Sequence, residues 1–186
     1  LSEADMHHAI RVLGVTIRQL SLDRWHTVRL LLSYRTMTAN VWLDGKPLIE
    51  GVPLVRTAVI MPIYHEPIER TFGGLRAVYR SLEATGHLEH FDFFILSDSR
   101  DPEVWLAEQS AWYRLCRELG ADGRLFYRRR QLNLKYKSGN IADFFRRWGR
   151  NYRYSLVLDA DSLMGGETIV RMVRLMEVEP AVGILQ

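Results

Sequence analysis

The chain has 186 residues, of which 47% are hydrophobic and 25% charged, so it can form a globular domain of ordinary size and is not a disordered chain. Its net charge is +3, no stretch reaches the ~18 uncharged apolar residues of a membrane-spanning helix, and residues 1–5 do not resemble a signal peptide, so we expect a soluble protein. The single cysteine, Cys116, excludes an internal disulfide and indicates a reducing compartment.

Residues 1–55 are predicted to form an appendage that contains a helix and a hairpin. Apolar residues follow helical spacing at Ile10, Leu13, Ile17 and Leu20. The amphipathic pattern is expected to continue through residues 28–34, and residues 41–46 (VWLDGK) are typical of a hairpin with an Asp-Gly turn. We expect the appendage to pack on the rest of the protein; the alternatives are a helix on a membrane surface and a segment that becomes ordered only in a larger protein.

From residue 56 onward, apolar runs alternate with amphipathic segments. Strands are predicted at residues 57–62, 91–97, 124–128, 154–158 and 182–185. Helices are predicted at residues 68–85, 102–119, 138–148 and 167–178. Asp101 is expected to cap the second helix, and Gly86 and Gly120 to end the first two. This order predicts an α/β domain over residues 56–186, with a mostly parallel sheet and helices on both faces in three layers.

Polar side chains follow three of the predicted strands. Residues 64–66 (YHE) follow the first strand, Asp98 follows the second, and Asp159 and Asp161 follow the strand at 154–158. Ligands of parallel sheets bind outside the carboxyl ends of the strands. We therefore expect these side chains to meet in one crevice.

Asp159 and Asp161 are one residue apart, so both carboxylates would point to the same face if the strand continued through them. At ~5 Å and an effective dielectric of ~20, their repulsion is about 3 kcal/mol, which a divalent cation would remove. Oxygen ligands favour Mg²⁺ or Mn²⁺ and leave coordination positions for substrate phosphates. The alternative is an acidic pair that only caps a helix or lies in a solvated turn.

Residues 124–153 contain ten Lys or Arg residues and one acid, Asp143, so this segment carries +9 and the rest of the chain −6. Such a concentration of charge predicts an anionic partner. A helix start preceded by Lys137, with Gly139 for close backbone approach, would suit a diphosphate. The competing interpretations are a nucleic-acid surface and arginines that are simply solvated.

Other common sites are not indicated. The sequence has no G-x-G-x-x-G after the first strand and no G-x-x-x-x-G-K-[ST], which argues against dinucleotide redox chemistry and P-loop hydrolysis. The six histidines form no zinc-binding pattern.

Four segments occur in the order and spacing of family 2 processive glycosyltransferases, which have a GT-A fold: residues 62–66 (PIYHE), 95–99 (ILSDS), 137–140 (KSGN) and 158–161 (LDAD). The resemblance covers residues 56–186 and is greater still to the branch that builds osmoregulated periplasmic glucans at the bacterial inner membrane. It implies the donor-binding half of an enzyme that transfers glucose from UDP-glucose to a growing β-glucan, with inversion and with Mg²⁺ or Mn²⁺.

The resemblance also implies roles for individual residues. Tyr64 and Glu66 would border the nucleotide pocket, with Tyr64 stacked on uracil, and Asp98 would accept a hydrogen bond from the uracil imide. His65 stands where the family usually has asparagine, so it receives no role.

On the phosphate side, Lys137 would approach the diphosphate. Asp159 would face the ribose and phosphate, and Asp161 would bind the cation, with Asp159 beside it in the metal site.

The family's general base, its acceptor-holding Arg-Arg-Trp motif and its membrane helices would follow Gln186. We therefore expect donor binding without turnover, no catalytic residue in this chain, and a position at the cytoplasmic face of the inner membrane for the whole protein. Its partners would be UDP-glucose, a glucan acceptor and the remaining parts of the enzyme, and no nucleic acid is expected. The alternatives are a cellulose-synthase-like or polyprenyl-phosphate sugar transferase, a non-catalytic module that binds RNA or acidic lipid, and a regulatory pseudoenzyme.

Overall fold

The computed structural model describes residues 28–33, 38–43, 46–47, 49, 52–178 and 182–185. The chain divides into two compact units, one of residues 1–53 with 171–186 and one of residues 54–170, which we call the sheet unit. The division predicted at residue 55 stays a prediction.

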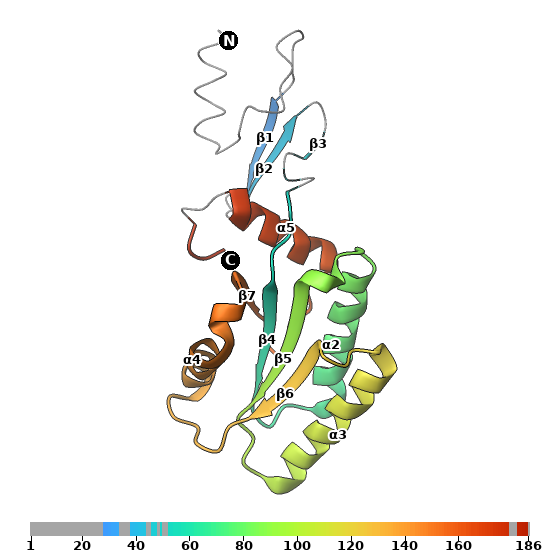
Figure 1. Cartoon of the computed structure of the whole chain (residues 1–186), viewed down its shortest axis with the longest axis vertical. Helices are drawn as coiled ribbons and strands as arrows, with labels where there is room; N and C mark the ends of the chain where they lie inside the picture. Colours follow the sequence, from blue (N-terminus) through green and yellow to red (C-terminus); the bar gives the residue numbers. More distant parts are fainter. Residues whose placement is uncertain are drawn as a thin grey trace. The chain divides into compact units, whose positions relative to one another are not determined.

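The sheet unit is built on four parallel strands in the order β6-β5-β4-β7 (Figure 1). The strands are β4 (Thr57–Ile63), β5 (Phe91–Ser97), β6 (Leu125–Arg129) and β7 (Tyr154–Val157). The helices are α2 (Ile68–Glu83), α3 (Pro102–Leu119), α4 (Tyr136–Trp148) and the first five residues of α5 (Gly166–Val178), with short 3-10 helices at Leu88–His90 and Gly149–Asn151. The predicted elements between residues 57 and 178 are all present, with bounds that differ by two residues at most.

Helices cover both faces of the sheet, which confirms the predicted three-layer arrangement. The central strands β4 and β5 are almost wholly buried, and their side chains alternate between the two faces. On one face, Phe94 of β5 packs against Phe144 of α4, with ring centroids 4.8 Å apart. On the other, Phe93 packs against Tyr79 of α2 at 5.1 Å. Figure 1 shows α4 on one side of the sheet and α2 and α3 on the other.

The ends of α3 follow the predicted capping signals. Asp101 accepts a hydrogen bond from the Glu103 N–H at 2.9 Å, Pro102 is the first helical residue, and Gly120 ends the helix at φ 59°. None of the helices in the described part of the chain is long and apolar enough to cross a membrane.

The other unit contains a small antiparallel sheet of β1 (Val28–Ser33), β2 (Thr38–Leu43) and β3 (Lys46–Pro47). The predicted hairpin is confirmed by the pairing of Leu43 with Lys46, and its turn residues lie outside the described ones. The amphipathic continuation predicted at 28–34 is wrong, because residues 28–33 form a strand. A short apolar run is compatible with both the helical and the strand periodicity, and here pairing with β2 stabilises the strand. The helix predicted around residues 10–20 lies outside the described residues.

The strand predicted at residues 182–185 is also wrong. These four residues adopt no strand conformation, and Ile184 is 80% exposed. A short apolar run becomes a strand only where a neighbouring strand can pair with it, and the sequence pattern alone does not report that neighbour.

The start of α5 is fixed against α2 by a glycine. The Gly166 N–H donates to the Ser81 hydroxyl at 2.8 Å, and a Cβ on Gly166 would lie only 2.3 Å from the Ser81 carbonyl oxygen. This close contact sets where the loop that carries Asp159 and Asp161 ends.

Replacing Gly166 with alanine should therefore destabilise the protein by about 1–3 kcal/mol, because the new methyl group would push α5 from α2. The matched control is Gly73→Ala within α2, where a Cβ meets nothing within 4 Å, and this change should stabilise by about 0.5–1 kcal/mol. Urea denaturation followed by circular dichroism measures both. Equal effects of the two changes would contradict the close contact.

Candidate functional site

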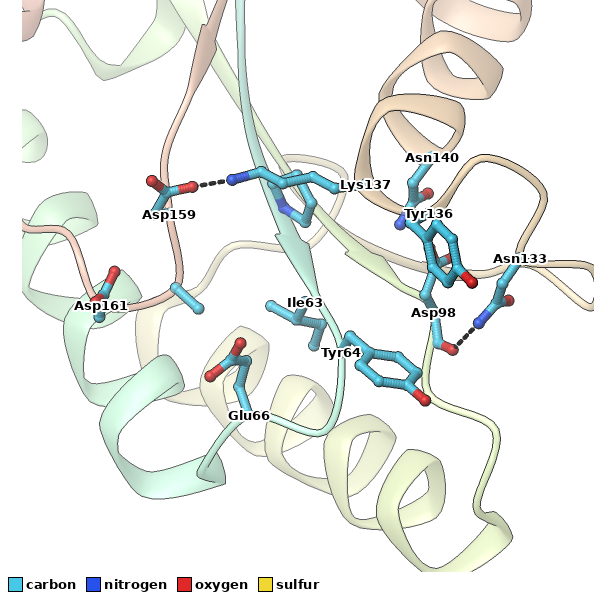
Figure 2. A pocket seen from close by; sticks show the side chains of 12 residues that line it. Ile63, Tyr64, Glu66, Asp98, Asn133, Tyr136, Lys137, Asn140, Asp159 and Asp161 are labelled. Carbon is cyan, nitrogen blue, oxygen red and sulfur yellow. Dashed lines mark hydrogen bonds and ion pairs between the residues drawn. The ribbon is translucent and has the colours of Figure 1, made fainter.

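A cavity of about 430 Å³ lies at the carboxyl ends of β4, β5 and β7. We call it the edge cavity. Its lining includes the six residues to which the sequence assigned binding roles, Tyr64, Glu66, Asp98, Lys137, Asp159 and Asp161 (Figure 2). The convergence expected from the parallel topology is therefore present, while the role of each residue stays a prediction.

The loop after β4 presents Tyr64 and Glu66, and two hydrogen bonds attach it to the loop after β5. The His65 N–H donates to the Ser99 hydroxyl at 3.0 Å, and the Arg100 N–H donates to His65 Nε2 at 3.3 Å. His65 adopts a left-handed conformation at φ 55°. The contacts of His65 thus position its neighbour Tyr64, which is 56% exposed.

Asp98 is buried, and an arginine fixes its carboxylate. Arg130 donates from Nε to Oδ1 at 2.5 Å and from Nη2 to Oδ2 at 2.7 Å, and Asn133 donates to the Asp98 carbonyl oxygen at 2.5 Å. A bidentate guanidinium holds a carboxylate in one orientation. Each Asp98 oxygen keeps a lone pair that can accept a further hydrogen bond from a ligand.

Below these loops lies Glu108 of α3, which our sequence analysis did not identify. Its side chain is fully buried and accepts hydrogen bonds from Ser97 at 2.6 Å, Ser99 at 2.5 Å and Tyr127 at 2.8 Å. Burial raises the pKa of Tyr127, so its hydroxyl stays a proton donor. Glu108 lies seven residues before Leu115 and therefore on the apolar face of α3, and an acid at such a position could have been predicted to be buried.

Asp159 and Asp161 lie in a turn, so the strand geometry expected for them is wrong. β7 ends at Val157, and the Ser162 N–H donates to the Asp159 carbonyl oxygen at 3.0 Å. Aspartate is favoured in turns because its side chain competes with regular backbone pairing. The turn still directs both carboxylates to the cavity, and Asp159 forms an ion pair with Lys137, drawn as a dashed line in Figure 2.

The start of α4 differs from its prediction in two respects. The helix begins at Tyr136, so Lys137 lies in its first turn and does not precede it. A Cβ on Gly139 would lie 1.9 Å from the Leu134 carbonyl oxygen, so glycine accommodates the chain's own turn and not a ligand. Arg130 stabilises this turn by donating to the carbonyl oxygens of Leu134 at 2.9 Å and Tyr136 at 2.7 Å.

Two asparagines add acceptors that the sequence analysis missed. Asn140 is buried and donates to the Leu96 carbonyl oxygen at 2.8 Å, as Asn133 does to Asp98. Within the described part of the chain, the side-chain oxygens of both asparagines accept no hydrogen bond. Both residues line the cavity, so each places an unpaired acceptor beside it.

The acidic pair suits a cation that is shared with a ligand. Asp159 and Asp161 are exposed and supply hard oxygen donors. Residues 52–178 and the shorter described ranges contain no group of three or more His, Cys, Asp or Glu that could hold a metal ion. Two carboxylates fit Mg²⁺ or Mn²⁺ only if ligand oxygens or waters complete the coordination.

Cys116 of α3 is not a candidate nucleophile. It is buried and its thiol donates to the Leu125 carbonyl oxygen at 3.5 Å. Burial raises the pKa of the Cys116 thiol to about 11, so the reactive thiolate is scarce at neutral pH.

A doubly wound parallel sheet with a polar cavity at its carboxyl edge defines an α/β domain of the class that binds ligands at strand ends. No protein-family model matches the chain. The chain is 60% identical to glucans biosynthesis glucosyltransferase H of Pectobacterium carotovorum over 134 residues. The aligned region covers 72% of this chain and 16% of that protein.

Proteins of the same name from Ralstonia nicotianae and Pseudomonas paraeruginosa are 59% and 56% identical over 131 residues, in each case 70% of this chain and 15% of the relative. The chain is thus homologous to a segment of the glucans biosynthesis glucosyltransferase H proteins, which confirms the predicted resemblance. It spans 15–16% of the length of these relatives.

The Glu108 contacts predict a large effect of a small change. Glu108→Gln should destabilise the protein by about 1–3 kcal/mol, because an amide NH₂ would face a hydroxyl that needs an acceptor. The control is Glu103→Gln, an exposed residue in the first turn of the same helix, which should cost less than about 1 kcal/mol. Urea denaturation gives both values, and a tolerated Glu108→Gln would show that the three hydroxyls have other acceptors.

Proposed function

We propose that this chain forms the donor-binding part of a glucosyltransferase that transfers glucose, with inversion, from UDP-glucose to a growing β-glucan. The supporting observation is one cavity lined by acidic, basic and aromatic side chains from four separate chain segments. The relatives' name favours glucan synthesis over cellulose-synthase-like or polyprenyl-phosphate sugar transfer. In this proposal the whole protein works at the cytoplasmic face of the inner membrane, and no catalytic base is assigned to this chain.

The uracil would bind between Tyr64 and Asp98. The exposed Tyr64 ring offers a face for stacking, which is worth about 1–3 kcal/mol per base in proteins that bind single-stranded nucleic acids. Asp98 is held in one orientation by Arg130, so its free lone pairs can accept the imide N–H. The unsatisfied oxygens of Asn133 and Asn140 could accept further ligand N–H or O–H groups.

The diphosphate would bind at the start of α4. Lys137 lies in the first turn of this helix, where free backbone N–H groups and the helix dipole also favour an anion. In the structure Lys137 pairs with Asp159. A bound diphosphate would draw Lys137 away and leave Asp159 and Asp161 available to a cation. Mg²⁺ or Mn²⁺ held there would neutralise the negative charge that develops on the departing UDP.

Calorimetric titration with UDP-glucose tests the proposal. We expect binding with Mn²⁺ that weakens at least about tenfold in EDTA and is lost in Asp161→Ala, because Asp161 is assigned to the cation. The control is Asp122→Ala, an exposed aspartate that does not line the cavity, which should bind as the unchanged protein does. Equal affinity with and without metal would contradict the metal dependence, and no binding under either condition would contradict the proposal.

Lys137 should act on the diphosphate and not on the nucleoside. Lys137→Met is expected to weaken UDP about 10- to 100-fold, the typical worth of a charge-assisted hydrogen bond, and to leave uridine unchanged. Arg117→Met is the control, since this exposed basic residue of α3 does not line the edge cavity. Calorimetry for UDP and ligand-observed NMR for uridine make the comparison, and a parallel loss of uridine would reject the assignment.

A further inference from the structure

A second cavity, of about 720 Å³, lies beside the edge cavity and is strongly basic. The two share residues 131–140 as a wall. Asn133 and Lys137 line the edge cavity, whereas Leu134 and Lys135 line the second one. We call it the basic cavity, and its cationic lining residues are Arg128, Arg129, Arg130, Lys135, Arg146 and Arg147.

Protein carboxylates neutralise only part of this charge. Arg130 is paired with Asp98, on the edge-cavity side. Asp143 is the one acid among the lining residues, and it is shared by Arg146, Arg147 at 3.0 Å and Arg128 at 3.6 Å. Two carboxylates therefore pair with four of the six cations, and the six together keep an excess of four positive charges.

Arg128 is the least compensated of these cations. Its Nη2 donates to the Asn140 carbonyl oxygen at 3.2 Å, but Nε and Nη1 are buried and make no hydrogen bond within the described residues. Burial lowers the pKa of Arg128, the direction expected where a charge is desolvated without sufficient compensation. Buried guanidinium groups normally have acceptors for their N–H groups.

We propose that the basic cavity is a second anion site, separate from the edge cavity, and that it binds a phosphate-bearing ligand. Guanidinium groups match phosphate because they donate two parallel hydrogen bonds to its oxygens. The charge excess suits a ligand with two or more negative charges. This proposal goes beyond glucosyl transfer and does not depend on it.

The phosphate could belong to a soluble ligand or to a lipid headgroup. Leu132 and Leu134, which line the basic cavity, are 72% and 70% exposed. Exposed leucines beside arginines are also found where proteins meet anionic membranes. The test therefore needs one soluble probe and one vesicle probe.

The soluble probe is inorganic pyrophosphate, titrated by calorimetry in EDTA. We expect pyrophosphate binding to persist in Lys137→Met, which removes the lysine that lines the edge cavity. We expect it to weaken at least about tenfold in Arg146→Gln/Arg147→Gln. Both of these arginines are exposed, so the variant should fold. The matched control is Arg114→Gln/Arg117→Gln, which removes the same charge from exposed positions of α3 and should bind normally.

The vesicle probe compares co-sedimentation with phosphatidylcholine alone and with added phosphatidylglycerol. Binding to phosphatidylglycerol vesicles that is lost in Arg146→Gln/Arg147→Gln and kept in Arg114→Gln/Arg117→Gln assigns the site to a headgroup, even without pyrophosphate binding. The proposal is overturned if neither probe binds, if both double variants behave alike, or if Lys137→Met abolishes pyrophosphate binding, which would assign the anion to the edge cavity.

Discussion

The geometry of the edge cavity depends on one buried carboxylate. Glu108 accepts hydrogen bonds from Ser97 at the end of β5, from Ser99 in the loop that follows, and from Tyr127 of β6. Ser99 in turn accepts the His65 N–H, so the loop after β4 is fixed through the same group. Because the two carboxyl oxygens together offer about four acceptor positions, three hydroxyl donors can converge on them without conflict. Loops that would otherwise move independently thus take their positions from the sheet.

Arg130 extends this order to the segment that separates the two cavities. Its guanidinium binds the Asp98 carboxylate and also donates to two backbone carbonyl oxygens of the turn that begins α4. In that turn Lys135 and Tyr136 both have positive φ, a conformation that costs free energy in residues other than glycine and persists only where contacts hold it. Arg130 thus fixes both Asp98 in the edge cavity and the turn that the two cavities share. A ligand that shifts this turn would change both cavities. Binding in one cavity would then change affinity in the other, and the effect would be equal in both directions.

Most of the fold follows from local signals in the sequence. The cap at Asp101, the glycine at Gly120 and the seven-residue apolar strands place the elements, and parallel topology brings Asp161 to the same edge as the first two loops. What the sequence did not reveal depends on partners distant along the chain. Glu108 resembles any helical acid until its three hydroxyl donors are placed around it, and Gly139 appears suited to a ligand until the Leu134 carbonyl occupies that space. A strand pattern also cannot show where pairing stops, so the turn after β7 was missed.

The ion pair between Lys137 and Asp159 explains why, under the proposed function, nucleotide and cation should bind together. In the structure this lysine offsets one of the two carboxylates of the turn. A diphosphate that takes Lys137 would leave the like charges of Asp159 and Asp161 uncompensated. A cation removes that repulsion and gains ligand phosphate oxygens at the same time. Under the proposed function, each component would therefore raise the affinity for the other.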